Sequence, residues 1–303
     1  MFSKVLIPLD GSERAQLILT YLKPLLLRAD ARVVLFQAAQ YPATPGTVAY
    51  VPTVDFEPAA RHYIDQATAA LGAEGVHARG LVRVGPAAAC ILDAIDDEGA
   101  SMVALATHGR TGVARWTLGS VAEKVIRSCP VPVLAFRSFP SERSLSANLV
   151  PPQALAPERI LVPLDGSENS LGVTPFAIAL ARLFDSRVSL LRVHEAGEHG
   201  ETPRRGPPGM QAGPAPAFGA VTVERALRQF ADAGVAAELV ETSGDPGTQI
   251  LRTAHQSGAK LIAIATHGRS GPTRWMLGSV TEKVLRASEV PLLIVRSPQL
   301  KSR

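Results

Sequence analysis

The sequence has few of the features that mark secreted, membrane or metal-binding proteins. Its two cysteines, Cys90 and Cys129, form no CxxC pair and have no histidine at ligand spacing, so neither a disulfide framework nor a metal centre is expected. No apolar run approaches the roughly 18 residues of a membrane span. The opening MFSKVLIPLDGS starts a strand almost at once and does not read as a secretory signal. We therefore expect a cytoplasmic protein with two buried thiols and no membrane contact.

Charge and motif content exclude further classes. Lysine and arginine number 31 against 27 acidic residues, and no basic run carries interleaved aromatics, so nucleic acid is not an expected partner. Neither G-x4-G-K-[ST] nor a strand-linked G-x-G-x-x-G occurs, which excludes a P-loop NTPase and a dinucleotide enzyme. His108 and His267 have no evident acid or nucleophile partner for a catalytic triad. We expect no enzyme activity beyond a weak ATPase.

The two halves of the chain repeat one another. The segment ATHGRTGVARWTLGS at 106–120 returns as ATHGRSGPTRWMLGS at 265–279, with 11 of 15 positions identical. The flanking matches are KVLIPLDGSE at 4–13 with RILVPLDGSE at 159–168, and CPVPVLAFRS at 129–138 with SEVPLLIVRS at 288–297. A repeat of this length is a duplicated domain. The predicted organisation is a first domain over 1–140, a Ser- and Pro-rich linker over 141–156, and a second domain over 157–303.

Each half alternates short apolar runs with helical patterns. In the first half the expected strands lie near 5–9, 31–38, 77–84, 101–106 and 131–137, and the expected helices near 13–28, 57–73, 85–99 and from 120 onward. Strict alternation predicts a parallel sheet covered on both faces. The fold class expected for each half is therefore α/β, a doubly wound, Rossmann-like, open five-stranded parallel sheet with helices on both faces.

The repeated segment combines a glycine loop with a helix start. It follows an apolar strand, so it lies at the carboxyl end of the sheet, where ligands of such sheets bind. Gly119-Ser120 opens a helix, whose exposed N–H groups and dipole favour an anion. A purely structural alternative is that Ser120 with Glu123, and Ser279 with Glu282, form S-x-x-E capping boxes. The two interpretations are compatible.

These motifs resemble the universal stress protein family over nearly the whole chain, as a tandem two-domain member. The resemblance is carried by LIPLDGSE and LVPLDGSE, by THGR(T/S)G, by LGSV(A/T)EKV(I/L)R and by the closing VPVLAF and VPLLIV, and the pattern G-x2-G-x9-G-[ST] is that family's nucleotide-binding signature. The family implies one ATP site per domain, with any Mg²⁺ held mainly by phosphates and water. The implied site residues are Pro8, Asp10, Ala38, Ala106, Gly109, Gly119, Ser120 and Val121, and Pro163, Asp165, Val193, Ala265, Gly268, Gly278, Ser279 and Val280.

The resemblance also assigns roles within each site. The aspartates, Asp10 and Asp165, contact the nucleoside, although taken alone each fits an N-cap or Asx-turn better. Ala38 and Val193 line the adenine pocket, and the Gly-Ser-Val segments with the preceding glycine face the phosphates. The expected function is an ATP-binding stress-response regulator that switches with its nucleotide and hydrolyses it slowly or not at all.

One departure from the signature favours an alternative. Its first glycine is alanine in both halves, Ala106 and Ala265. If the methyl points at the ribose, affinity falls, and the chain is then a stress-induced interaction protein that binds no nucleotide. An adenylating or phosphoryl-transferring enzyme of this fold has no catalytic constellation in the sequence to support it.

The closing strands at 131–137 and 290–296 are apolar and lie at the predicted edge of each sheet. An exposed apolar edge needs cover. The resemblance implies that the two domains pair through these strands as an internal pseudo-dimer, and two chains can associate further as a homodimer. The protein partner of the switch is not identified by the sequence.

Overall fold

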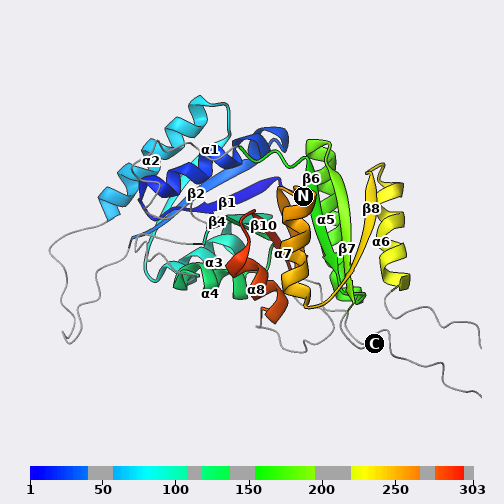
Figure 1. Cartoon of the computed structure of the whole chain (residues 1–303). Helices are drawn as coiled ribbons and strands as arrows, with labels where there is room; N and C mark the ends of the chain where they lie inside the picture. The colour runs from blue at the N-terminus through cyan, green and yellow to red at the C-terminus, as the bar shows by residue number, and fades with distance from the viewer. Residues whose placement is uncertain (40–56, 108–117, 137–153, 195–219, 267–276, 297–303) are drawn as a thin grey trace, which may run out of the picture. The chain divides into compact units, whose positions relative to one another are not determined.

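The chain folds into two compact units, Met1–Ala156 and Pro157–Arg303 (Figure 1). The computed structural model describes residues 1–39, 57–107, 118–136, 154–194, 220–266 and 277–296. Each unit is presented separately below. The predicted pairing of the closing strands concerns the placement of one unit against the other, and it stays a prediction.

Unit 1 is a five-stranded parallel sheet with the strand order β3-β2-β1-β4-β5. Helices α1 and α2 lie on one side of the strands, and α3 and α4 lie on the other (Figure 1). The elements are β1 Lys4–Pro8, α1 Glu13–Arg28, β2 Arg32–Ala39, α2 Glu57–Ala73, β3 Ala78–Val84, α3 Ala87–Glu98, β4 Met102–Ala106, α4 Ser120–Ser128 and β5 Val133–Phe136. This confirms the doubly wound α/β fold predicted from the alternation of strands and helices.

Burial explains why the strands read as continuous apolar runs. Val5, Leu6 and Ile7 of β1 are completely buried, because helices cover both faces of a parallel sheet. The edge strand β3 has no fully buried residue by contrast, and its sequence ARGLVRV carries two arginines. Helix α3 ends at Gly99, whose φ of 59° is the left-handed conformation that glycine adopts at a helix C-terminus.

Unit 2 repeats this plan with the strand order β10-β9-β6-β7-β8. Its elements are β6 Arg159–Leu164, the 3-10 helix η2 Glu168–Val173, α5 Thr174–Phe184, β7 Arg187–His194, α6 Ala220–Asp232, β8 Ala237–Ser243, α7 Pro246–Ser257, β9 Leu261–Ala265, α8 Ser279–Ala287 and β10 Leu292–Val295. The first helix differs from its counterpart in unit 1. A 3-10 turn enters it, and Pro175 lies in the first turn of α5, where a missing N–H costs nothing.

The strand order creates a switch point in each unit. Strand β1 pairs with β2 on one side and with β4 on the other, and β6 pairs likewise with β7 and β9. The connections that leave each central strand on its two sides cross opposite faces of the sheet. A crevice therefore opens outside the carboxyl ends of these strands. The residues that follow these strands therefore lie at the edge where ligands of such sheets bind.

The last residues of the predicted linker pack on unit 1. The Leu155 N–H donates to the Tyr21 carbonyl of α1 at 2.8 Å, and Leu155 is 1% exposed. The Tyr21 ring meets Phe136 of β5 edge-to-face at a centroid distance of 4.9 Å. Burial raises the pKa of the Tyr21 phenol. The end of the predicted linker is thus fixed to the middle of α1.

Candidate functional site

The aspartate that follows the first strand of each unit closes a tight turn. The Asp10 Oδ1 accepts hydrogen bonds from the Ser12 backbone N–H at 3.0 Å and from the Ser12 hydroxyl at 2.6 Å. The Asp165 Oδ1 accepts from Ser167 at the same two distances, 3.0 and 2.6 Å. This confirms the Asx-turn alternative. It does not oppose a role in binding, because a carboxylate has two oxygens and about four lone-pair sites.

Each turn is anchored to the helix that follows the second strand. Gly11 between the aspartate and the serine has a φ of 82°, which a residue with a side chain rarely adopts, and Gly166 has the same value. In unit 1 the Tyr63 hydroxyl of α2 donates to the Ser12 carbonyl at 3.3 Å. In unit 2 the Thr222 hydroxyl of α6 donates to the Gly166 carbonyl at 2.8 Å. Two different side chains thus hold the same turn.

The glycine before the last helix is bonded to the end of the fourth strand. The Gly119 N–H donates to the Thr107 carbonyl at 2.8 Å, and the Thr107 N–H donates to the Phe136 carbonyl at 2.7 Å. In unit 2 the Gly278 N–H donates to the Thr266 carbonyl at 2.9 Å. A Cβ on Gly278 would lie 2.8 Å from that carbonyl oxygen, so the close approach requires glycine.

The predicted capping boxes are wrong. Gly119 is the N-cap of α4, with φ −60° and ψ 141°, and Ser120 is the first helical residue. Gly278 and Ser279 take the same places at α8. The glutamates are therefore one residue too far into the helix to reach back, and they pair forward. Glu123 accepts from Arg127 at 3.1 Å, and Glu282 accepts from Arg286 at 2.8 Å.

This correction changes the chemistry of the helix start. A glycine N-cap supplies no side-chain oxygen, whereas the first N–H groups of a helix lack partners within the helix. Ser120 and Val121 are exposed there, Val121 by 38%. The positive end of the dipole of α4 is thus presented at the carboxyl edge of the sheet, which suits an anion.

The strand order brings most of the predicted site residues to one crevice in each unit. They follow or end the three adjacent strands β2, β1 and β4, or β7, β6 and β9, and begin the last helix. These residues are Pro8, Asp10, Ala38, Ala106, Gly119, Ser120 and Val121 in unit 1, and Pro163, Asp165, Val193, Ala265, Gly278, Ser279 and Val280 in unit 2. Gly109 and Gly268 lie outside the described residues.

Polar neighbours of the crevice that the motif comparison missed come from β3, α3, β8 and α7. Arg83 pairs in register with Ala38, and Thr242 with Val193. At the start of α7 the Asp245 carboxylate caps the helix by accepting from the Thr248 N–H at 2.9 Å and contacts Lys283 of α8. The constant offset of 159 residues between β3 and β8 is the sequence signal that would have paired these positions.

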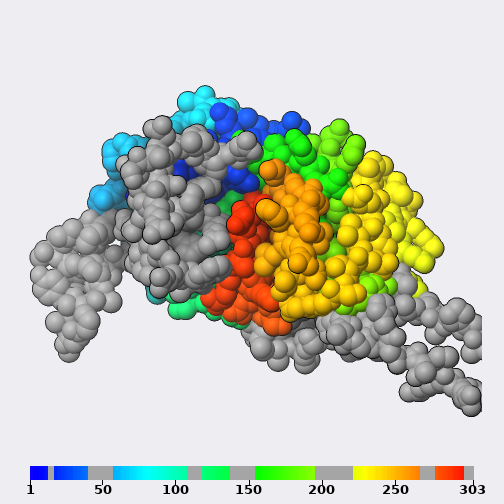
Figure 2. All heavy atoms as spheres, viewed as in Figure 1, coloured from blue at the N-terminus to red at the C-terminus, as the bar shows by residue number. Residues whose placement is uncertain are grey.

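The Asp245–Lys283 contact also has an electrostatic effect. The hydrogen bond from Lys283, followed by those from Thr248, holds the pKa of the Asp245 carboxyl well below its usual range. Figure 2 shows α7 and α8, in orange and red, side by side. Unit 1 has Pro86 at the corresponding N-cap and no side-chain cap there. Among the described residues, no cluster of three or more His, Cys, Asp or Glu side chains is arranged to hold a metal ion.

The geometry defines a tandem α/β protein in which each unit has a helix start without a side-chain cap at the carboxyl ends of its central strands. The sequence matches the profile of the universal stress protein family twice, over residues 1–137 and 157–296. The chain belongs to the universal stress protein family. No helix in the part of the chain that the structure describes is both long and apolar enough to cross a membrane.

Relatives agree with this assignment. Universal stress protein YxiE of Bacillus subtilis is 32% identical over 148 residues, which cover 46% of this chain and 98% of its own. Universal stress protein Rv2005c of Mycobacterium tuberculosis is 30% identical over 207 residues, covering 65% of this chain and 62% of its own. The crystal structure of a universal stress protein from Archaeoglobus fulgidus shares the fold with a TM-score of 0.68, at 19% identity and 98% coverage of both chains.

Proposed function

We propose that each unit binds one molecule of ATP, with Mg²⁺ carried by the phosphates, at the carboxyl ends of its three central strands. The protein then acts in the cytoplasm as a nucleotide-dependent switch of the stress response. The family membership supports the stress-response role. The crevice chemistry supports the ligand, because an uncapped helix start suits phosphates and a carboxylate accepts from ribose hydroxyls.

The observation that carries this proposal is the repeated bond between strand end and helix start. In both units a glycine N–H meets the threonine carbonyl beyond the fourth strand, at 2.8 Å for Gly119 and 2.9 Å for Gly278. The bond holds a glycine at the N-cap, where no side chain competes with a ligand for the exposed N–H groups. Helix capping alone does not need this geometry, since a serine at the N-cap would stabilise the helix better than glycine does.

The same crevice supports a switch with slow or no turnover. Among the described residues that the resemblance places in the two sites, the titratable side chains are the aspartates, which are held in their turns. A general base needs a titratable group within hydrogen-bond reach of an attacking water. The aspartates sit on the nucleoside side of the proposed ligand and not at its terminal phosphate. In this proposal the nucleotide acts by its presence, and binding alters the surface that a protein partner meets.

The alanines that replace the first glycine of the signature bear on affinity. Ala265 is 7% exposed, so its methyl group is already covered by protein. Ala106 is half-buried. A covered methyl group removes little room from a crevice, which supports binding in unit 2 in particular. The alternative, an interaction protein that binds no nucleotide, is the other outcome of the test below.

The test is calorimetric titration of the nucleotide-stripped protein with Mg-ATP. We expect saturation near two sites per chain. Ser120→Asp and Ser279→Asp each put a carboxylate among the proposed phosphate contacts, and each should remove one site by weakening it about tenfold or more. An acidic residue in the first helical turn is itself stabilising, so folding is preserved.

Gln66→Glu is the matched control, because it adds the same charge on an exposed position of α2. It should leave both sites intact. If no heat is released at two temperatures and ATP does not raise the melting temperature, the nucleotide proposal is wrong and the interaction protein takes its place.

We also propose that the two units pair through their closing strands as a pseudo-dimer, as the sequence predicts. The apolar sequences VLAF of β5 and LLIV of β10, each at one end of its unit's strand order, support this arrangement. Cross-linking of engineered cysteines on the two strands tests it. Efficient intramolecular cross-links are expected, and cross-links found only between chains would support the homodimer instead.

A further inference from the structure

The strand order of each unit ends in a strand with one described neighbour. These strands are β3, which pairs with β2, and β8, which pairs with β7. Alternate residues of such an edge point their N–H and C=O groups outward, where another strand can bind them. In β3 these are the even-numbered residues, because the His77 carbonyl and the Gly85 N–H bond to β2. In β8 they are the odd-numbered residues, because the Ala236 carbonyl and the Gly244 N–H bond to β7.

The two edge strands carry opposite charges. The β3 sequence ARGLVRV contains Arg79 and Arg83, whereas the β8 sequence AELVETS contains Glu238 and Glu241. Two β3 strands side by side would bring arginines together, and two β8 strands would bring glutamates together, both of which are unfavourable across a strand pair. Each edge is thus protected against its own kind. Charge complementarity favours the pairing of β3 with β8.

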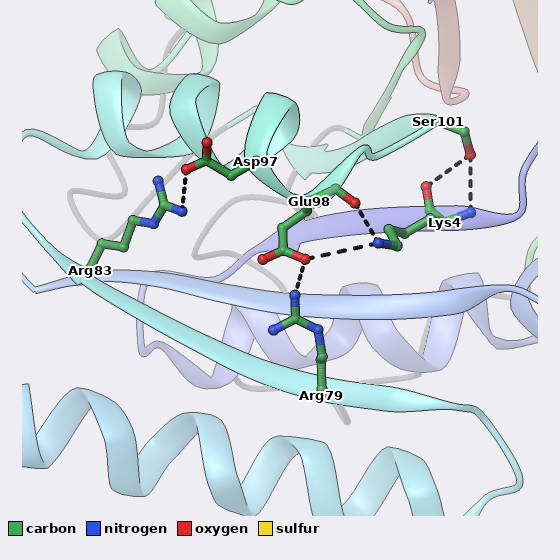
Figure 3. A network of polar contacts seen from close by, with 6 residues as sticks. All are labelled: Lys4, Arg79, Arg83, Asp97, Glu98 and Ser101. Carbon is green, nitrogen blue, oxygen red and sulfur yellow. Dashed lines mark hydrogen bonds and ion pairs between the residues drawn. The ribbon is translucent and has the colours of Figure 1, made fainter.

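The charged side chains have bonding capacity left for such a pairing. Arg83 donates from Nη2 to Asp97 of α3 at 2.7 Å (Figure 3), and a guanidinium has five N–H donors. Glu238 accepts from both Arg159 and Ser189 through Oε1. A carboxylate has a second oxygen, so Oε2 can accept from a further donor. An ion pair between Arg83 and a second chain's Glu238 can therefore form while both internal contacts are kept.

One antiparallel register matches the two strands along their whole length. It sets residues 78–84 of β3 against residues 243–237 of β8, so that Arg83 lies opposite Glu238. Val82 then lies opposite Leu239, and both are outward-pointing residues of their edges. Leu239 is 40% exposed, and a pairing strand would cover it. Opposite residues share a face of the sheet, so this register adds an apolar contact to the ion pair.

We propose that β3 of one chain adds to β8 of a second copy of this chain as an antiparallel strand pair. Each chain has one edge of each kind, so the contact is head-to-tail. Such a contact closes into a ring where the rotation allows it and otherwise propagates. The inference is independent of the nucleotide sites. It uses the strands at the end of each unit's order that lies opposite the closing strands.

The experiment measures the mass of the full-length protein by sedimentation equilibrium over a range of concentrations. The unaltered chain of 32.0 kDa should associate in a concentration-dependent way. Arg83→Glu and Glu238→Arg should each weaken self-association about tenfold or more, because each sets like charges opposite one another. An equimolar mixture of the two variants should associate again, since each variant then offers the edge that the other requires. Loss of folding does not produce this rescue.

Arg61→Glu is the matched control for charge, because Arg61 is a 60% exposed residue of α2 outside the strand edge. It should leave association unchanged. Val82→Pro tests the backbone: it removes an N–H that points away from β2, so the internal ladder is retained while the edge loses a donor. This variant should also weaken association.

Three results would overturn the inference. The first is an unaltered chain that stays monomeric at every concentration. The second is a mixture of Arg83→Glu and Glu238→Arg that does not associate. The third is an assembly that persists in Val82→Pro and in both charge variants, which would place the contact on another surface, such as the closing strands. Each result leaves the nucleotide proposal to its own titration.

Discussion

At the amino end of each sheet, the first strand begins with a basic residue at the same position in both units. The acidic residue that pairs with it lies in a different element in each unit. In unit 1, Lys4 at the start of β1 and Arg79 of β3 both contact Glu98 in the last turn of α3 (Figure 3). In unit 2, Arg159 begins β6 in the same way, but its acidic partner is Glu238 of β8. The acid has moved from the helix to the strand.

Both positions involved, the one on the strand and the one on the helix, differ between the units. Glu238 stands where unit 1 has Arg79, and Ser257 stands where it has Glu98, each 159 residues further along the chain. Hydrogen bonds from Ser189 and then from Arg159 lower the pKa of the Glu238 carboxyl. Partly solvated ion pairs depend weakly on which element carries which charge. The amino edge thus tolerates rearrangement as long as opposite charges still meet.

The carboxyl edge does not show the same freedom. Both units keep the aspartate turn at identical distances, and the bonds from the helix-start glycines differ by 0.1 Å, as 2.8 Å for Gly119 and 2.9 Å for Gly278. These are backbone geometries that few residue types satisfy. The contrast indicates that the crevice is defined by its main chain, whereas the charges around it are free to diverge between the units.

The largest effect on stability is expected from replacing the helix-start glycine that both units share. Gly278→Ala puts a Cβ 2.8 Å from the Thr266 carbonyl oxygen, so the backbone has to move. We expect a loss of about 1–3 kcal/mol in the free energy of unfolding, measured by urea denaturation. Gly119→Ala should behave alike, because the corresponding hydrogen bond in unit 1 has nearly the same length.

Gly72→Ala is the control for this prediction. Gly72 lies inside α2, and a Cβ there would meet no atom within 4 Å. Alanine should raise stability by about 0.5–1 kcal/mol, because it is the better helix former. A Gly278→Ala protein as stable as the unaltered chain would show that the close approach to Thr266 is not required.

A smaller effect is expected from the acids that differ between the units. The Glu98 side chain is 14% exposed, and the Glu238 side chain is 60% exposed. Glu98→Gln leaves two cations without their countercharge in a half-buried place and should cost about 1–2 kcal/mol of unfolding free energy. Glu238→Gln should cost less than about 1 kcal/mol, as surface pairs do. Urea denaturation of both proteins, at low and high salt, measures the difference.

Moving the acid tests whether the two arrangements are equivalent. Arg79→Glu alone sets a second carboxylate beside Glu98. Arg79→Glu combined with Glu98→Ser reproduces the arrangement of unit 2, so its destabilisation should be smaller than the sum of the single effects. Strict additivity of the two changes would mean that Lys4 does not accept the relocated partner.

The sequence was informative where one local pattern admits one structure. The continuous apolar runs predicted both five-stranded sheets, and α1 and α2 begin and end where the helical patterns do. The strand ends then brought the aspartates and the Gly-Ser pairs to one crevice, because strand order follows from the handedness of the connections. The first helix of unit 2 was less regular than predicted, since Gly172 and Pro175 favour a 3-10 entry.

Contacts between segments that are distant in the sequence could not be predicted from local patterns. Ser-x-x-Glu suggested a capping box, but the bond of Gly119 to Thr107 sets the helix start one residue earlier than that box requires. Arg83 gave no local signal, because its place beside Ala38 depends on strand register. The burial of Leu155 against α1 was not predicted, because this residue belongs to a Pro-rich segment whose composition is typical of a linker. Local patterns specify elements, and register and packing specify neighbours.

The smallest expected effect concerns the exposed cap of α7. The folded-state pKa of Asp245 is depressed, chiefly by Lys283, so its contribution to stability is fully present above its unfolded pKa of about 3.9 and is lost progressively as the pH falls from that value through the lower folded-state pKa. Asp245→Asn keeps an acceptor for the Thr248 N–H but removes the charge. Its melting temperature should lie below that of the unaltered protein at pH 7, and the gap should narrow as the pH falls below about 3.9 toward the depressed folded-state pKa.

Unit 1 offers the converse experiment. Pro86 has φ −62° and ψ 120°, close to the −69° and 120° of Asp245, so its backbone is already suited to an N-cap, and Lys124 stands where unit 2 has Lys283. Pro86→Asp should introduce the same pH dependence of the melting temperature into unit 1. The net stability is the poorer readout, because loss of proline frees the unfolded chain and offsets the gain. If no acid-sensitive increment appears, the cap of unit 2 depends on Thr248, for which unit 1 has Ala89, and not on the aspartate–lysine pair alone.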